Sequence, residues 1–145
     1  MKGLLYFIKN YLKLLVFWIL LFDVQRILFS VHHYGKLEGV SFGDWLLTFI
    51  YSLRLDLATA AYLSVVPLLL LSLSTVMKRV WIDRSFYVVL LIESVFVALI
   101  HSGEINVYSE WNHKLTSRVF MHLSNPDEVF RTASYLSTFL FVFYV

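Results

Sequence analysis

Five ionisable residues stand inside otherwise apolar stretches of this 145-residue chain: Asp23, Arg26, Arg54, Asp56 and Glu93. A charged side chain in a lipid-embedded helix is costly, so each is a candidate for function and needs a partner. Asp23 and Arg26 are three residues apart, which places them on one helix face where they can neutralise each other. Arg54 and Asp56 are two apart and point to opposite sides of a helix, so each needs a partner on another helix, or water.

The role of Arg54 has two interpretations. In the first, Arg54 and Asp56 lie toward the outer leaflet, and the Arg54 guanidinium binds a lipid phosphate through two hydrogen bonds. In the second, Arg54 forms an inter-helix ion pair with Asp23 or Glu93 that fixes the bundle. The substitution Arg54→Ala separates them: loss of a headgroup contact weakens binding of anionic lipid, whereas loss of a structural pair destabilises the bundle.

A second polar cluster follows the third apolar stretch, and it contains Glu104, Asn106, Tyr108, Glu110 and Trp111. It either shapes a pocket at the membrane surface or belongs to the interfacial belt in which Trp and Tyr concentrate. The residues predicted to contact lipid headgroups are Arg54, Asp56, Glu104, Asn106, Glu110 and Trp111. The remaining intramembrane charges are interpreted as structural, and they are Asp23, Arg26 and Glu93.

Metal and nucleophilic chemistry find little support in the sequence. Glu110 and His113 form a Glu-x-x-His pair, but carboxylate metal sites in bundles use two such pairs with two further Glu. A metal or haem site through His101, His113 and His122 is therefore a third hypothesis only. The chain has no Gly-x-Ser-x-Gly, no glycine-rich phosphate loop and no cysteine, so we assign no catalytic residue, metal ligand or cofactor to it.

The composition indicates an integral membrane protein. Hydrophobic residues make up 59% of the chain and charged residues 15%, and the mean hydropathy is +0.73. A soluble domain of this size cannot bury so much apolar surface, and a disordered chain is far less hydrophobic. The net charge of +2 is small and scattered, which excludes the clustered basic face typical of nucleic-acid binding.

These patterns predict an all-α, polytopic membrane bundle. Four spans are expected, at about residues 12–31, 45–76, 86–102 and 126–145. Pro67 is expected to kink the second span. Trp111, Leu115, Val119 and Leu123 recur every four residues, which predicts a short amphipathic interfacial helix over about residues 107–123.

Basic residues set the expected orientation. The N-terminus, with Lys2, Lys9 and Lys13, and the basic segment 78–84 are predicted to be cytoplasmic, with segments 32–44 and 103–131 outside. The last eleven residues are strongly apolar and no polar residue follows them. We therefore expect the chain to be a fragment of a longer product.

Three stretches resemble the N-terminal membrane domain of lipoteichoic acid synthase-like proteins, the sulfatase-related phosphoglycerol transferases of bacterial envelopes. Residues 22–29 are similar to an Arg-x-x-Phe pattern of that family. Residues 52–67 are similar to its Gly-x-Arg-x-Asp-Leu-Ser…Tyr…Pro pattern, with Ser52 in the place of Gly. Residues 104–134 are similar to its Asp/Glu…Tyr…Glu-Trp…Leu…Pro-x-Glu…Ser stretch.

In that family a five-span domain precedes a large extracytoplasmic domain of the alkaline phosphatase type. That domain holds a divalent metal, usually manganese, and a threonine nucleophile, and it transfers phosphoglycerol or a related group from lipid. The resemblance implies a multi-pass anchor in a bacterial cytoplasmic membrane that helps lipid access and has no catalysis of its own. Its partners are then membrane lipids and the missing catalytic domain. The alternative is a stand-alone small membrane protein that scaffolds a partner or binds anionic lipid.

Overall fold

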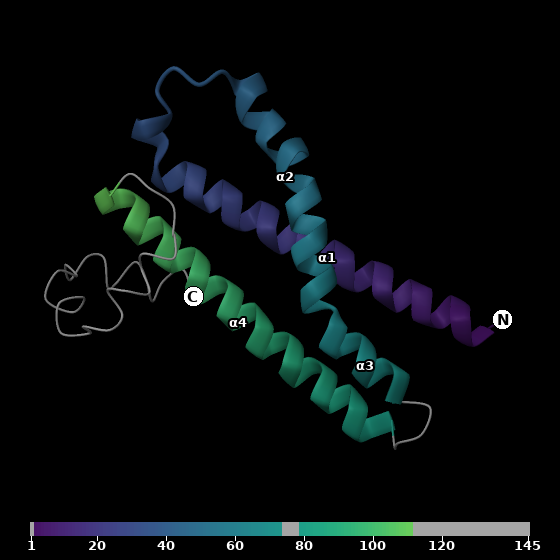
Figure 1. Cartoon of the computed structure of the whole chain (residues 1–145). Coiled ribbons are helices and arrows are strands. Elements are labelled where there is room, and N and C mark those ends of the chain that lie inside the picture. The colour runs from purple at the N-terminus through teal and green to yellow at the C-terminus, as the bar shows by residue number, and fades with distance from the viewer. Residues whose placement is uncertain (1, 74–78, 112–145) are drawn as a thin grey trace, which may run out of the picture. The chain divides into compact units, whose positions relative to one another are not determined.

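The computed structural model describes residues 2–73 and 79–111, which form helices and short connections without any strand (Figure 1). The elements are α1 (Lys2–His32), the short 3-10 helix η1 (Tyr34–Leu37), α2 (Phe42–Leu63), α3 (Val65–Leu73) and α4 (Arg79–Trp111). For this part of the chain the all-α prediction is confirmed.

Three helical stretches are long and apolar enough to cross a membrane: Phe7–His32, Phe42–Leu73 and Trp81–Ser109. The shortest has 26 residues, or about 39 Å at 1.5 Å per residue, against a hydrocarbon thickness of about 30 Å. At most 17% of the most apolar part of each stretch is buried, so most of these side chains need lipid around them. The chain is a membrane protein. The fourth expected span, residues 126–145, lies outside the described residues.

The connection between α1 and α2 follows from local chemistry. Gly39 has a φ of +92°, a left-handed conformation that glycine adopts without steric cost. Ser41 then caps α2, because its Oγ accepts a hydrogen bond of 3.2 Å from the Gly43 N–H, and Asp44 stands in the positive first turn. The helix break expected between the first two spans is present.

The expected kink at Pro67 is confirmed. Proline has no N–H, and its ring clashes with the carbonyl four residues earlier, which here is Leu63, the last residue of α2. Ser64 holds the junction, since its N–H and its Oγ donate to the Ala60 carbonyl at 2.9 and 2.6 Å. Ala60, Ser64 and Pro67 are all buried, so the side chains at the kink are shielded from the surroundings of the helix.

The third span is longer than expected. Its end was predicted near residue 102, but α4 continues through the polar residues after it to Trp111. The Asn106 Nδ2 donates to the Ser102 carbonyl at 2.9 Å, and the Ser109 Oγ donates to the Ile105 carbonyl at 3.1 Å. These side chains bond to their own helix, so their polarity does not end it. Of the interfacial helix predicted over 107–123, residues 107–111 belong to α4 and the rest lie outside the described part.

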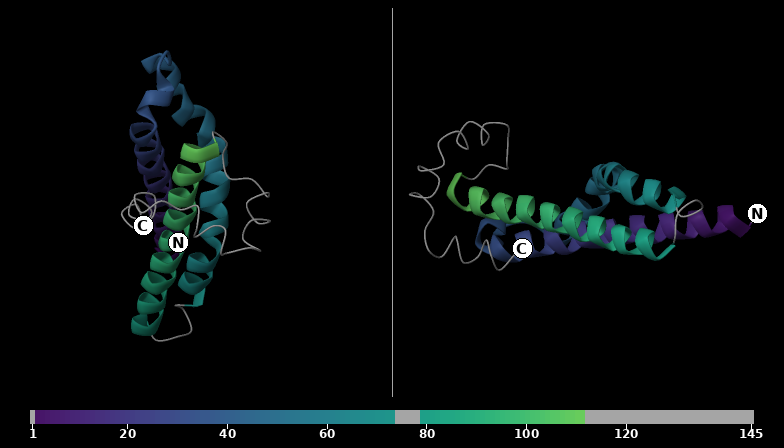
Figure 2. Two further views of the ribbon diagram at one scale, coloured as in Figure 1. Left: turned by 90° about the vertical axis from the view of Figure 1, so that its left-hand side faces the viewer. Right: turned by 90° about the horizontal axis from the view of Figure 1, so that it is seen from below.

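The chain divides into two compact units, Met1–Glu93 and Ser94–Val145, and α4 passes from the first to the second. Within the first unit, α1 and α2 contact each other where they cross (Figures 1 and 2). Trp18 of α1 is fully buried and its ring stacks on Phe22 at 6.1 Å between centroids. The α1–α2 pair is therefore the framework that positions the candidate site.

Candidate functional site

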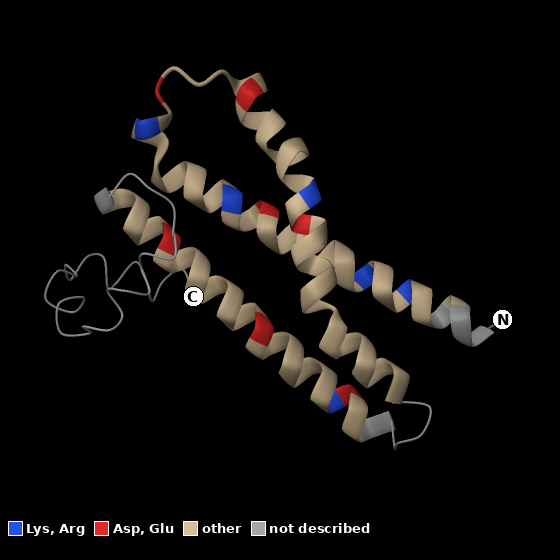
Figure 3. Cartoon of the chain, in the orientation of Figure 1, with Lys and Arg blue, Asp and Glu red and all other residues tan. Residues whose placement is uncertain are grey.

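Arg26 of α1 lies between two carboxylates. Its Nη1 donates to Asp23 Oδ1 at 2.8 Å, within α1, and its Nη2 donates to Asp56 Oδ2 at 2.9 Å, on α2. The side chains of Arg26 and Asp56 are 20% and 15% exposed, and that of Asp23 is 33% exposed. Charged residues accordingly gather near the crossing of α1 and α2 (Figure 3). We call Asp23, Arg26 and Asp56 the ion triad; it links the two helices through one guanidinium.

An aromatic row continues from the ion triad along α2. The Arg26 Cζ is 5.1 Å from the centroid of the Phe49 ring, a cation–π contact. Phe49 meets Trp45 edge-on at 4.9 Å, and Trp45 stacks on Phe42 at 5.8 Å. The spacing 42, 45, 49 keeps these rings on one side of the helix. Arg26 is thus held by a ring as well as by two carboxylates.

Ser30 forms a second link between α1 and α2, one helical turn nearer than Arg26 to the connection between the two helices. The Trp45 Nε1 donates to Ser30 Oγ at 3.0 Å, and Ser30 Oγ donates to the Arg26 carbonyl at 2.9 Å. In lipid such groups have no water to bond with, so pairing them inside the protein is essential. The Ser30 hydroxyl therefore links the indole of Trp45, on α2, to the backbone carbonyl of Arg26, the central residue of the ion triad.

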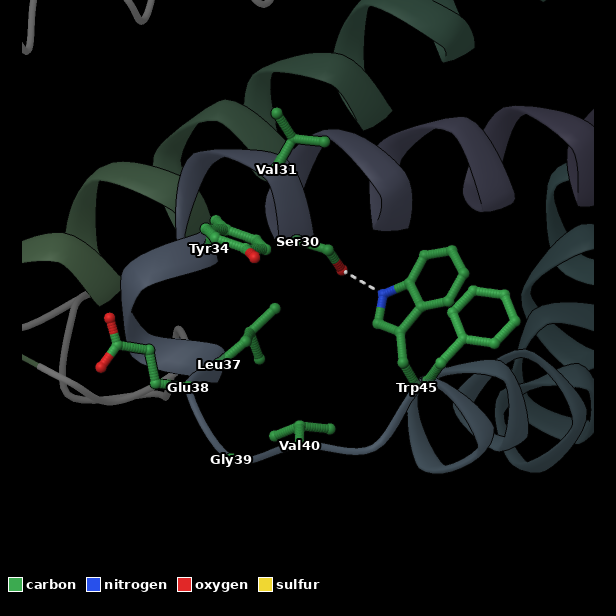
Figure 4. A pocket seen from close by; sticks show the side chains of 9 residues that line it. Ser30, Val31, Tyr34, Leu37, Glu38, Gly39, Val40 and Trp45 are labelled. Atoms are coloured by element: carbon green, nitrogen blue, oxygen red, sulfur yellow. Dashed lines mark hydrogen bonds between the residues drawn. The ribbon is translucent and has the colours of Figure 1, made fainter.

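An open cavity of about 650 Å³ lies beyond Trp45, between the end of α1, η1 and the start of α2 (Figure 4). Its lining residues are Ser30, Val31, Tyr34, Leu37, Glu38, Gly39, Val40, Phe42 and Trp45. Leu37 and Trp45 point into it, whereas Glu38 points away from it. Its walls are mainly apolar and suit the chain of an amphiphile. They hold no pair of groups suited to acid–base or nucleophilic chemistry.

Arg54, the first residue predicted to contact headgroups, is exposed and forms no ion pair or hydrogen bond with the residues that the structure describes. The second interpretation of the sequence was that Arg54 forms an inter-helix ion pair with Asp23 or Glu93. Asp23 instead binds Arg26, and the inter-helix ion pair joins Arg26 to Asp56. Because Asp56 faces α1, Arg54, two residues away, lies on the opposite side of α2.

The other predicted residues are divided between the units. Glu93 on α4 is half-buried, and its Oε2 is buried without a hydrogen bond to the described part of the chain. Glu104 and Asn106 are half-buried on α4 in the second unit. Glu110 and Trp111 are the last two residues of α4, and their side chains lie outside the part of the chain that the structure describes. Of the nine intramembrane and headgroup candidates, the structure brings Asp23, Arg26 and Asp56 into contact.

The metal hypothesis has no geometric support in residues 2–73 and 79–111, which contain no group of three or more His, Cys, Asp or Glu placed to hold a metal. Two of its three histidines, His113 and His122, lie outside those ranges.

Sequence reasoning missed Ser30, Trp45 and Phe49. A signal was present, because aromatic residues at 42, 45 and 49 follow a helical period and Ser30 stands four residues after Arg26. Such a row predicts that this side of α2 is a contact face.

No family model, curated protein or solved structure matches this chain.

Proposed function

We propose that this chain is a membrane anchor whose α1–α2 pair is fixed by the ion triad and presents Arg54 to anionic lipid headgroups. The observation that carries the proposal is the contrast between a neutralised Arg26 and an exposed Arg54 in the same helix pair. A guanidinium in a membrane needs an anion, and a lipid phosphate accepts the two parallel hydrogen bonds that arginine offers.

The position of Arg54 along α2 supports contact with headgroups. It lies twelve residues after Phe42, about 18 Å along the helix at 1.5 Å per residue. The long arginine side chain can extend toward the nearer membrane surface, which is the surface at the α1–α2 connection. Basic residues at the N-terminus favour a cytoplasmic start, and this surface is then the outer one.

The proposal extends to the parent protein through the sequence resemblance. We propose that the chain forms part of the membrane domain of an envelope phosphoglycerol transferase of the lipoteichoic acid synthase-like sulfatase family, in a bacterial cytoplasmic membrane. The transfer chemistry and its manganese ion would belong to a following extracytoplasmic domain. An antibody against this chain tests the idea on native membranes. A product much larger than 17.0 kDa supports it, and a 17.0 kDa product favours a stand-alone scaffold or lipid-binding protein.

Headgroup binding is tested on the purified chain extracted from vesicles of phosphatidylcholine and phosphatidylglycerol in equal parts. Native mass spectrometry counts the phosphatidylglycerol molecules retained. Arg54→Gln is expected to lower the affinity for phosphatidylglycerol about fivefold, since one basic residue near an anionic surface contributes about 1 kcal/mol. Arg54→Lys keeps the charge but loses the two-bond geometry, so an intermediate loss is expected.

Arg84 provides the matched control, because it is another exposed arginine, at the start of α4. Arg84→Gln removes the same charge elsewhere and is expected to change retention less. Equal losses in both variants would indicate unspecific charge attraction and contradict the proposal. The proposal would also be contradicted if the Arg54→Gln variant unfolded more easily but retained phosphatidylglycerol as before.

A further inference from the structure

The first half of α1 carries a second basic surface, which neither the ion triad nor Arg54 uses. Lys9 and Lys13 are four residues apart and share one side of the helix. Both are exposed, and neither forms an ion pair with the residues described in the structure. A shallow, open hollow of about 490 Å³ runs along this side between side chains of α1 alone, namely Leu5, Ile8, Lys9, Leu12, Lys13 and Val16. We call it the lysine groove.

The charge of the lysine groove has no counter-ion on α1. No Asp or Glu precedes Asp23 in the sequence, and Asp23 is bound to Arg26. Like charges four residues apart repel each other on a helix. An anion that lies between the two ammonium groups would remove this repulsion, and it must come from outside α1.

The length of α1 is compatible with a position of the two lysines near a membrane surface. The helix has 31 residues, or about 46 Å, which exceeds a hydrocarbon thickness of about 30 Å. Its end at His32 leads into the connection to α2, on one side of the membrane. Lys13 lies 19 residues before His32, about 29 Å along the helix, and Lys9 lies about 6 Å further. With His32 within one headgroup layer, about 5 Å outside the hydrocarbon, Lys9 would stand at the opposite edge of the hydrocarbon, and the long side chain of Lys13 would extend to the same headgroup layer.

We propose that the lysine groove binds an anionic phospholipid of the membrane, at the surface opposite to that of Arg54. The phosphate lies between the ammonium groups of Lys9 and Lys13. The acyl chain follows the apolar part of the groove that leads into the membrane, over Leu12 and Val16. The alternation of two cations with four apolar side chains fits an amphiphile of negative charge, and this site is independent of the function proposed for Arg54.

The test measures lipid selectivity of the full chain in phosphatidylcholine vesicles by electron paramagnetic resonance of spin-labelled phosphatidylglycerol. The double variant Lys9→Gln/Lys13→Gln is expected to lower the selectivity for phosphatidylglycerol about twenty-five-fold, since each lysine contributes about 1 kcal/mol, and to weaken its dependence on salt. The variant Lys9→Arg/Lys13→Arg keeps both charges and is expected to stay within about twofold of the unchanged chain. Circular dichroism confirms that each variant remains helical.

Arg84→Gln again serves as the control for a lost charge elsewhere, and Arg54 stays intact throughout. Unchanged selectivity in the double Gln variant overturns the proposal, and so does an equal loss in Arg84→Gln. A second arm adds glycerol phosphate, which has the headgroup chemistry without the acyl chain. Failure of glycerol phosphate to displace the labelled lipid supports binding in the groove, and complete displacement at millimolar concentration overturns it.

Discussion

Arg26 and Arg54 belong to the same helix pair, yet their surroundings are opposite. Arg26 faces the α1–α2 contact, where it bonds to two carboxylates and lies over the ring of Phe49. Arg54 is exposed on the other side of α2 and has no ion pair within the described part of the chain. The same residue type is therefore paired on the side of a helix that faces its neighbour and exposed on the side that faces away from it.

The largest effect is expected from Arg26→Met. The substitution leaves Asp23 and Asp56 as two neighbouring carboxylates without a cation, in a site where Asp56 is only 15% exposed. Removing one partner from a largely buried ion pair destabilises a protein by about 3 kcal/mol. Unfolding of the purified chain in mixed micelles with increasing dodecyl sulfate measures the change.

A triple variant, Arg26→Met with Asp23→Asn and Asp56→Asn, sharpens this prediction. It removes every charge of the ion triad, so at least half of the lost stability should return. A triple variant as unstable as Arg26→Met alone would show that charge is not the cause. The contact of the Arg26 side chain with Phe49 would then be the main contribution.

The two carboxylates of the ion triad are expected to differ as well. Asp56→Asn weakens the bond between α1 and α2, and a hydrogen bond to a charged group contributes about 1.5 kcal/mol. Asp23→Asn weakens a more exposed contact within α1, for which about 0.5 kcal/mol is expected. Double-mutant cycles of each with Arg26→Gln, measured by the same unfolding assay, give the two coupling energies. Equal coupling energies would contradict the division into an inter-helix and a local contact.

Much of this fold could be predicted from local features of the sequence. The apolar stretches are long enough to span a membrane, Pro67 kinks the second of them, and Asp23 and Arg26 meet at their i,i+3 spacing. The kink and the ion pair depend on residues within about two helical turns, and the spans follow from the apolar composition of continuous stretches. The end of α4 was misjudged because polar residues after Ser102 bond to their own helix, so polarity there did not mark a helix end.

The partner of Asp56 could not be predicted, because its register depends on how two helices cross. Arg26 is six residues before the end of α1, about 9 Å, whereas Asp56 is fourteen residues after the start of α2, about 21 Å. A simple antiparallel pair would place Arg26 opposite the region of Trp45 and Phe49. The arginine lies over Phe49 as such a register requires, and its long side chain also reaches Asp56.

Trp45→Phe tests the second link between α1 and α2, the hydrogen bond from Trp45 to Ser30. It keeps an aromatic ring in the row along α2 but removes the N–H that donates to Ser30. A net loss of about 1 kcal/mol in unfolding free energy is expected for one hydrogen bond. Trp81→Phe is the matched control, because Trp81 is 66% exposed on α4, and it should change stability by less than about 0.5 kcal/mol. A similar loss in both variants would assign the effect to ring size.

The smallest effect on stability is expected from Arg54→Met, the counterpart of Arg26→Met. An exposed side chain without an internal partner changes the unfolding free energy by no more than about 0.5 kcal/mol when replaced. In the same micelle assay the two substitutions should therefore differ by about 2.5 kcal/mol, although each exchanges one arginine for one methionine. A cost above about 1.5 kcal/mol for Arg54→Met would reveal a partner for this guanidinium within the protein or its assembly. The two arginines would then both be structural, and the headgroup role of Arg54 would have to be abandoned.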